Sequence, residues 1–230
     1  MKLGIMQPYF LPYIGYFQLI KAVDKYVIYD DVNFIKGGWI NRNKILLNGN
    51  PFMINVPMQG ASSFKKINEI NVGVNKKKLL VIIEQAYKKA PYYSIVFPLI
   101  SEIIQYDNDN LALFISNSII KIAKYLHIDT EILLSSEIKK ENDLKAQEKV
   151  ISICKTLGAT EYYNAIGGQE LYNKNEFAQD NIELKFLKSE SIEYSQFKNE
   201  FVPWLSILDV MMFNTSEEIN VLLNGYIVYS

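Results

Sequence analysis

The sequence predicts an α/β protein with a mainly parallel sheet flanked by helices, together with a β-hairpin and a helical insertion. Three observations predict this class. Short apolar runs alternate with segments of helical periodicity at both ends of the chain. An Asn-Gly step separates two apolar runs, and three helical patterns fill the middle. The 230 residues are 49% hydrophobic and 21% charged, enough for one substantial core. We therefore expect one domain over residues 1–230, with a helical insertion or cap over residues 75–128.

The first part of the chain is predicted to form a βαβ-like unit followed by the hairpin. The unit consists of a strand over residues 2–6, a helix over residues 14–23 and a strand over residues 26–29. Asn48-Gly49 supplies the positive φ angles of a tight turn, so the apolar runs at 45–47 and 52–56 are predicted to pair across it.

Helices dominate the middle of the chain, and alternation returns in the last third. The three middle helices are predicted over residues 76–89, 92–105 and 111–127. In the first of them, Leu80, Ile83 and Tyr87 recur at helical spacing. Strands are then predicted over residues 131–134, 161–164 and 182–187, and helices over residues 143–157, 169–177 and 204–213. Strands separated by helices in this way favour a parallel sheet.

Composition excludes several functional classes. A formal net charge of -1 and a pI near 6.0 lack the basic footprint of a nucleic-acid-binding protein. One cysteine and one histidine provide neither a disulfide framework nor a zinc ligand set, so we expect no metal site. The N-terminal residues lack the apolar segment of a secretory signal, and no apolar run is long enough to span a bilayer. These features predict a cytoplasmic protein without direct membrane insertion.

An aromatic loop follows the first predicted strand. Five aromatic residues occur within the nine residues from Tyr9 to Phe17, punctuated by Pro12 and Gly15. Such a stiff segment suits the wall of a pocket for a sugar, a nucleotide base or a pantetheine arm. The alternative is that the rings fill the gap between the first helix and the sheet. The candidate binding residues here are Gln7, Tyr9, Tyr13 and Tyr16.

Arg42 is the single arginine among 24 basic residues, and it lies in a Gly-Gly-Trp-Ile-Asn-Arg-Asn segment. A lysine cannot reproduce the bidentate grip of a guanidinium on phosphate or carboxylate. Arg42 is therefore predicted either to bind an anionic ligand, with Trp39 and Asn41 beside it, or to clamp a buried carboxylate. Asp209, on a predicted helix that is apolar nearly all round, is the carboxylate to suspect.

Candidates for acid-base chemistry are few. Asp30 and Asp31 follow the second predicted strand, where open α/β sheets place functional groups, and one of them could be a general base. Adjacent strand residues point to opposite faces, so at most one should face a pocket, and the pair could instead form a turn. His127 has suitable chemistry, but a histidine at a helix C-terminus commonly interacts with the terminal carbonyls. Asp209 could itself be the base.

Two further features have structural alternatives. Asn164, Gly167 and Gly168 lie between a predicted strand and helix, where free backbone N–H groups could bind an anion, although an ordinary turn also fits. Cys154 lies on the apolar face of its predicted helix and is interpreted as an inert buried thiol.

The opening of the chain resembles nucleotidylyltransferases with a Rossmann-like sheet. Those enzymes begin their first helix with His-Ile-Gly-His, whereas this chain has Tyr13-Ile-Gly-Tyr16. Adenylyl transfer by that imidazole mechanism is not expected, but the resemblance implies a nucleotide-shaped pocket at the carboxyl ends of the strands.

Five motifs together resemble the WbqC-like family over almost the whole chain. They are the segments at residues 6–20, 29–32, 38–43, 164–168 and 201–209, which include Gln-Pro-Tyr-Phe-Leu-Pro-Tyr-Ile-Gly-Tyr-Phe and Phe-Val-Pro-Trp-Leu-Ser-Ile-Leu-Asp. The resemblance implies a place in O-antigen or capsule gene clusters, where some members have been proposed to transfer glycine or another acyl group to an amino sugar.

The expected function is accordingly transfer of an acyl or aminoacyl group to the amine of a nucleotide-linked deoxyamino sugar. The expected partners are that sugar and an acyl carrier, with an activated donor but no tightly bound cofactor. From the residues, Asp30 or Asp31 would act as base, with His127 as the second choice. The alternatives are a non-catalytic binding or scaffold protein and a degenerate nucleotidylyltransferase-like protein that binds a nucleotide.

Overall fold

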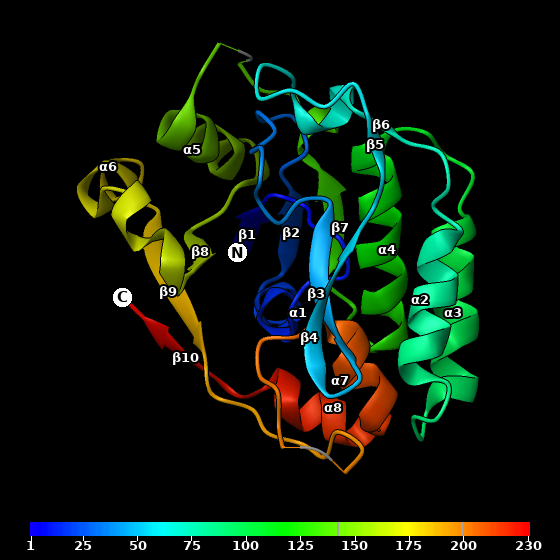
Figure 1. Ribbon diagram of the computed structural model, residues 1–230. Coiled ribbons are helices and arrows are strands. Elements are labelled where there is room, and N and C mark those ends of the chain that lie inside the picture. The colour runs from blue at the N-terminus through cyan, green and yellow to red at the C-terminus, as the bar shows by residue number, and fades with distance from the viewer. Residues whose placement is uncertain (142, 199) are drawn as a thin grey trace.

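A computed structural model describes residues 1–141, 143–198 and 200–230 and confirms the predicted fold class (Figure 1). Within these residues, six strands form a central sheet in the order β10-β9-β8-β1-β2-β7. All neighbouring strands pair in parallel except β10, which is antiparallel to β9. The strands are β1 (Lys2–Met6), β2 (Lys25–Ile28), β7 (Glu131–Leu134), β8 (Glu161–Ala165), β9 (Glu183–Ser189) and β10 (Tyr226–Tyr229).

The direction in which successive strands are added to the sheet reverses beside β1. From β1 the chain adds β2 and β7 on one side, then returns to add β8, β9 and β10 on the other. The gap between the carboxyl ends of β1 and β8 is therefore a topological switch point, where open α/β sheets bind ligands. The residues directly after β1 begin with Gln7, so the predicted aromatic loop starts at this point.

Helices cover both faces of the sheet. α1 (Ile14–Lys21) and α8 (Ser216–Leu223) contact each other on one face, and α5 (Ala146–Leu157) and α6 (Lys174–Gln179) lie on the other. Successive side chains of β1 point to opposite faces of the sheet, and Leu3 and Ile5 point to the face that α5 covers. These two residues belong to the core cluster that contains Cys154 of α5. The remaining helices pack on the α1 side.

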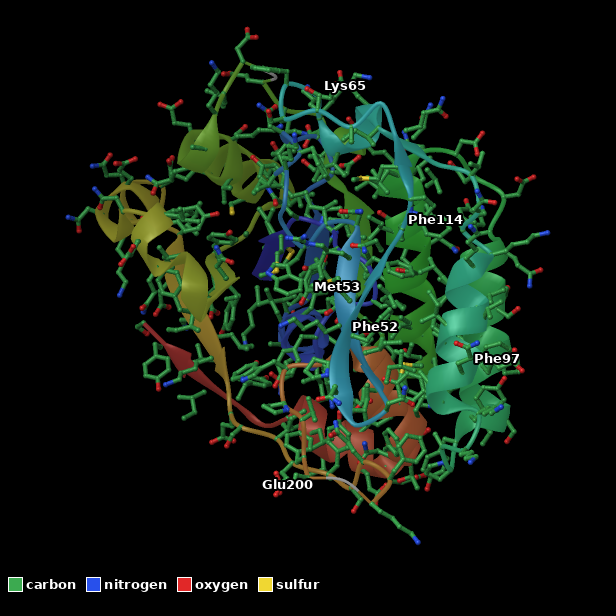
Figure 2. All side chains as sticks on the ribbon, in the orientation of Figure 1. Phe52, Met53, Lys65, Phe97, Phe114 and Glu200 are labelled. Atoms are coloured by element: carbon green, nitrogen blue, oxygen red, sulfur yellow. The ribbon has the colours of Figure 1, made fainter. Side chains whose placement is uncertain are left out.

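Three helices form the predicted insertion. They are α2 (Lys78–Tyr87), α3 (Tyr93–Gln105) and α4 (Leu111–Tyr125). α2 and α3 stand side by side, and α4 lies between α3 and the sheet (Figure 1). Phe97 of α3 is partly buried, whereas Phe114 of α4 is fully buried (Figure 2) and stacks on Phe10 with ring centroids 6.1 Å apart. The insertion therefore packs directly against the aromatic loop.

The predicted hairpin is present as β3 (Arg42–Leu47) and β4 (Asn50–Asn55). Asn48 and Gly49 have φ angles of 52° and 76°, the positive values that a tight hairpin turn requires. β3 contacts α2 and α7 (Ile207–Phe213). A second, short antiparallel pair is formed by β5 (Met58–Gln59) and β6 (Asn71–Val72).

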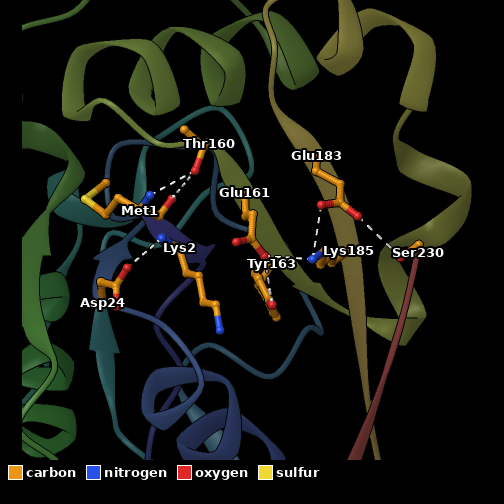
Figure 3. A network of polar contacts seen from close by, with 9 residues as sticks. All are labelled: Met1, Lys2, Asp24, Thr160, Glu161, Tyr163, Glu183, Lys185 and Ser230. Carbon is orange, nitrogen blue, oxygen red and sulfur yellow. Dashed lines mark hydrogen bonds and ion pairs between the residues drawn. The ribbon is translucent and has the colours of Figure 1, made fainter.

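A polar network ties together the amino ends of the strands and the C-terminal strand (Figure 3). Lys185 Nζ lies 2.8 Å from Glu161 Oε2 and 3.1 Å from Glu183 Oε2. Tyr163 donates its hydroxyl to the same Glu161 oxygen, and the backbone N–H of Lys2 donates to Asp24. This network lies at the edge opposite the switch point, so it stabilises the sheet without contributing to a site there.

Three predicted helices were wrong in their bounds. The helix predicted over 143–157 begins only at Ala146. The helix predicted over 169–177 is divided into a 3-10 helix (Ile166–Leu171) and α6. The helix predicted over 204–213 begins only at Ile207, because the hydroxyl of Ser206 accepts a hydrogen bond from the backbone N–H of Leu208 and caps the helix.

In the described part of the chain, no helix has the length and apolar character needed to cross a membrane.

Candidate functional site

A cavity of about 580 Å³ lies at the carboxyl end of β1. Its wall is built by the aromatic loop, the segment before β3 and one residue from the segment before α7. The lining residues are Met6, Gln7, Pro8, Tyr9, Tyr13, Ile35, Gly38, Trp39, Ile40, Asn43 and Trp204. We call it the aromatic cavity. Of the residues predicted to bind substrate, Gln7, Tyr9, Tyr13 and Trp39 line it.

Hydrogen bonds to main-chain carbonyls hold the aromatic loop in place. The buried amide of Asn43 donates to the carbonyl of Leu11 at 2.5 Å and to that of Phe10 at 3.4 Å. Ser206 Oγ donates to the same Leu11 carbonyl at 2.7 Å, and Ile207 N donates to Pro12 O at 2.7 Å. Two segments distant in sequence, one at Asn43 and one at Ser206 and Ile207, therefore fix this loop. Asn43 is a site residue that the sequence reasoning did not select.

Tyr9 and Tyr13 face the cavity, whereas Tyr16 supports them from the core. The backbone N–H of Tyr13 donates to the Tyr9 hydroxyl at 3.0 Å. Tyr16 is buried and does not line the cavity; its ring meets that of Tyr9 edge to face at 5.2 Å. Burial raises the pKa of Tyr9 well above its ordinary value, so its hydroxyl is neutral at physiological pH.

The two tryptophans of the chain both line the aromatic cavity. Trp39 is 49% exposed and Trp204 is 67% exposed. Trp204 precedes α7 in a left-handed conformation with φ 61°, and its ring lies 5.3 Å from that of Tyr13. Placing Trp204 in a buried helix was therefore wrong. Its apolar neighbours in sequence pointed to a core helix, and the capping Ser206 was the available signal that the helix starts later.

Arg42 braces the loop that carries Trp39. Its Nε donates to the carbonyl of Gly38 at 2.8 Å, and its Nη2 donates to that of Gly37. The guanidinium carbon lies 5.9 Å from the Trp39 ring. Within residues 1–141, 143–198 and 200–230, no carboxylate forms an ion pair with Arg42, so the suspected partnership with Asp209 is wrong. Asn41 does not line the cavity; its amide donates to the carbonyl of Val56 at 3.0 Å.

Asp209 is held in a buried network away from the cavity. One carboxylate oxygen accepts the Tyr87 hydroxyl at 2.7 Å. The other accepts the Tyr194 hydroxyl at 2.7 Å and the Gln196 amide at 2.6 Å. Burial raises the pKa of Asp209, although these three donors oppose the rise. Asp209 therefore joins α7 to α2 and to the segment before α7.

A second cavity, of about 540 Å³, adjoins the first, and Gln7 lines both. The lining residues are Gln7, Tyr29, Asp31, Val32, Asn33, Lys66, Leu144, Lys145, Ala146 and Lys149. We call it the basic cavity, because its lining holds three lysines and one carboxylate. That carboxylate, Asp31, was predicted as a catalytic candidate.

Asp30 and Asp31 face different surroundings, as expected for adjacent residues after a strand. Asp31 accepts the Ser135 hydroxyl at 2.6 Å, and its Oδ2 lies 2.9 Å from Lys149 Nζ and 3.0 Å from Lys140 Nζ. Burial would raise the pKa of Asp31, but the Ser135 hydrogen bond and the two ammonium groups outweigh it and lower the pKa. Asp30 is buried, lines neither cavity, and accepts the backbone N–H of Ser136 at 2.9 Å.

The other predicted site residues lie outside both cavities. His127 is exposed at the end of α4, beside the amino end of β7, and thus at the sheet edge opposite Asp31. Asn164 accepts the adjacent Ala165 N–H at 2.7 Å, and a Cβ on Gly168 would lie 2.7 Å from the Asn164 amide, so a larger residue there would require Asn164 to shift. A Cβ on Gly167 would meet nothing within 4 Å.

In the described residues, no group of three His, Cys, Asp or Glu side chains is placed to hold a metal ion.

Comparisons with known proteins show which family the chain resembles. Residues 7–221 match the WbqC-like protein family. The uncharacterized protein Rv1507c of Mycobacterium tuberculosis is 28% identical over 222 residues, which cover 94% of this chain and 95% of that protein. No solved structure gives a significant match. Because the family match covers most of the sequence, including every lining residue of the two cavities except Met6, the chain belongs to the WbqC-like protein family.

Proposed function

We propose that this protein transfers an acyl or aminoacyl group, such as glycyl, to the amine of a nucleotide-linked deoxyamino sugar in O-antigen or capsule synthesis. The observation that carries the proposal is the aromatic cavity at the carboxyl end of β1, the strand beside which the order of the parallel sheet reverses. Exposed indole rings and partly buried phenol rings suit stacking on a sugar or a base, and this sheet edge is where α/β proteins bind nucleotides. The family resemblance supplies the class of substrate.

The proposed reaction forms one amide bond. The sugar amine attacks the carbonyl carbon of an activated donor, a C–N bond forms, and the bond from that carbon to the carrier breaks. The carrier leaves with the bonding electron pair, and the ammonium proton passes to a base or to water. An amine with a pKa near 8, as for an α-amino group, is partly neutral at pH 7. Holding it against an activated carbonyl therefore supplies much of the acceleration without a strong base.

Asp31 is the candidate proton acceptor with the most suitable position, since it alone among the three predicted catalytic residues lines either of the two cavities described above. Its lysine partners lower its pKa and make it a weak base. Positioning of substrate through Lys149 is thus as important to the proposal as proton acceptance by Asp31.

A direct assay tests the proposal. Purified protein is incubated with a nucleotide-linked amino sugar and one activated donor at a time, namely an acyl thioester, an acyl adenylate or an aminoacyl-tRNA. Mass spectrometry should detect an amide product with at least one donor. The matched nucleotide sugar that carries a hydroxyl in place of the amine is the control and should remain unmodified. Absence of amide with all donor classes would reject the transferase.

A non-catalytic binding protein is the second candidate. The aromatic cavity supports it, because among its lining residues there is no carboxylate, imidazole or thiol. Tyr13 and Tyr16 stand where nucleotidylyltransferases have histidines, and of the two only Tyr13 lines the cavity. A pocket without these imidazoles fits binding of a nucleotide without adenylyl transfer. This alternative expects the amino sugar to bind and to be recovered unchanged in the same assay.

A further inference from the structure

We infer that the basic cavity binds the diphosphate group of the ligand, while the adjoining aromatic cavity holds an uncharged part of the same molecule. This inference rests on the proposed function and specifies how its substrate class is recognised. The two cavities share Gln7, so one ligand can cross from one to the other past that side chain. A diphosphate linked to a sugar and a nucleoside has the required combination of a charged centre and stacking groups.

The charge balance around Asp31 is the first argument. Lys140 and Lys149 both bind the same oxygen of Asp31, and their side chains are only 2% and 8% exposed. Two buried ammonium groups therefore share one carboxylate, and of the two lysines Lys149 lines the basic cavity whereas Lys140 does not. Asp30 does not relieve this excess, since it forms no ion pair with either lysine in the described residues and accepts its hydrogen bonds from Ser136 and Asn68. A buried charge without full compensation favours binding of an ion of opposite sign.

The remaining wall is also suited to an anion. Lys66 and Lys145 line the cavity and are exposed, and no ion pair is formed by either within the described residues. The helix α5 begins at Ala146 in the same wall, and its N-cap residue Lys145 provides no side-chain cap. The first N–H groups of a helix have no intrahelical acceptor, so they and the positive end of the helix dipole add to the lysine charges. Lysine ammonium groups bind phosphate as point charges from several directions.

The geometry also separates the two roles. Lys149 lies 5.1 Å from the Tyr29 ring in the basic cavity, whereas the aromatic cavity has no lysine or arginine in its lining. Arg42 and Lys44 lie 5.9 and 6.0 Å from the Trp39 ring but do not line the aromatic cavity, and Arg42 donates to the carbonyls of Gly37 and Gly38. A charged group placed in that cavity would therefore lose hydration without meeting a cationic group in the lining. The diphosphate is therefore assigned to the basic cavity, and a base or sugar ring to the aromatic cavity.

Binding measurements on the full chain test the inference. Calorimetry with a nucleoside diphosphate, its parent nucleoside and inorganic pyrophosphate reports on the basic cavity. Fluorescence reports on the aromatic cavity, because Trp39 and Trp204 are the two tryptophans of the chain and both line it. We expect pyrophosphate to bind without changing tryptophan emission, and the nucleoside diphosphate to bind more tightly than the nucleoside and to change the emission.

Two surface variants keep the buried lysines intact. Lys66→Gln and Lys145→Gln should each weaken pyrophosphate and nucleoside diphosphate binding about tenfold, the scale of one charge-assisted hydrogen bond. Binding of the nucleoside should not change. Lys65→Gln and Lys139→Gln are matched controls with the same charge change at exposed positions outside the lining, and Lys65 lies at the outer end of its loop (Figure 2). These controls should stay within about twofold of wild type, since salt screens more distant charges.

Failure of the inference is distinct from failure of the proposed function. Wild-type affinities in Lys66→Gln and Lys145→Gln, or no binding of pyrophosphate, would overturn the diphosphate site even if amide product is formed. A lysine-dependent diphosphate site in a protein that forms no amide would support the inference and reject the transferase. Equal weakening in the two controls would also overturn the site, because it would reduce the effect to general surface charge.

Discussion

The rings of Tyr13 and Trp204 lie with their centroids 5.3 Å apart, with planes inclined at 43°. Tyr13 precedes α1 and Trp204 precedes α7, so this contact joins the start of the chain to its last third. It forms one side of the aromatic cavity, and Trp39 is part of the same lining. The site is thus assembled from separate segments around the end of β1.

Trp204→Ala should weaken binding of the nucleotide-linked sugar by about 1 to 3 kcal/mol, the usual contribution of one base–aromatic stack. The melting temperature should change little, because Trp204 is 67% exposed and little of its apolar surface is buried on folding. Titration calorimetry and a thermal melt check both values. Phe64→Ala is the control, since Phe64 is 93% exposed and lies outside the cavity lining. Unchanged affinity in Trp204→Ala would exclude stacking at this position.

Arg42→Lys should lower the unfolding free energy by about 1 kcal/mol, because one ammonium cannot replace both guanidinium bonds to Gly37 and Gly38. Ligand binding should weaken together with stability, since these bonds hold the segment that carries Trp39. Urea unfolding measures the stability of the variant and ligand titration measures its affinity. Together they distinguish bracing of the Trp39 segment by Arg42 from direct contact of Arg42 with the ligand. Weaker binding with unchanged stability would instead indicate that Arg42 contacts the ligand's anionic group directly.

Asp31→Asn should destabilise the protein by about 3 kcal/mol at pH 7, because it leaves Lys140 and Lys149 buried without their carboxylate. The folded-state pKa of Asp31 lies below its unfolded value, so its stabilising contribution is present above about pH 4 and is lost as pH falls through the folded pKa. The stability difference between wild type and variant should therefore shrink below pH 4. Urea unfolding at pH 7 and pH 3.5 measures it, and a difference independent of pH would contradict the ionised pair.

Asp209→Ala should cost about 3 kcal/mol of stability, because Tyr87, Tyr194 and Gln196 lose a buried acceptor. The pKa of Asp209 is raised in the folded state, so its contribution is fully present below the unfolded pKa and is lost as pH rises through the folded pKa. Asp209→Asn stays neutral and should lose less stability than Asp209→Ala. Its stability relative to wild type should improve from pH 4 to pH 8; the opposite trend would show that the carboxylate is ionised in the core.

Cys154→Ala should leave any amide-forming activity unchanged. The thiol is fully buried on α5, and burial raises its pKa to about 12, so a thiolate nucleophile is not available at neutral pH. Product formation measured by mass spectrometry tests this, with circular dichroism as the check on folding. Loss of activity in a folded Cys154→Ala protein would require a covalent acyl-enzyme mechanism.

The sequence by itself determined the α/β class, the hairpin and the aromatic loop. These features depend on neighbours within a few residues: the short apolar run of β1, helical spacing in α2, and the positive φ angles of Asn48-Gly49. Tyr9, Tyr13 and Trp39, which the sequence predicted as binding residues, line the aromatic cavity, whereas Arg42 and Asn41, predicted beside Trp39, do not. Local pattern was sufficient for the aromatic loop but not for the segment that carries Arg42.

Only the tertiary structure decided the partners of the charged groups and the second half of the site. Arg42 could have paired with a carboxylate, but the turn of its own segment places two carbonyls within reach of the guanidinium. Asp31 is bound by Lys140 and Lys149, and Trp204 completes the wall that Tyr13 begins. Such contacts depend on which distant segments fold side by side. A charged or aromatic residue carries no local signal for its partner, because the interaction energy is set by distance in space and by burial, neither of which is fixed by spacing along the chain.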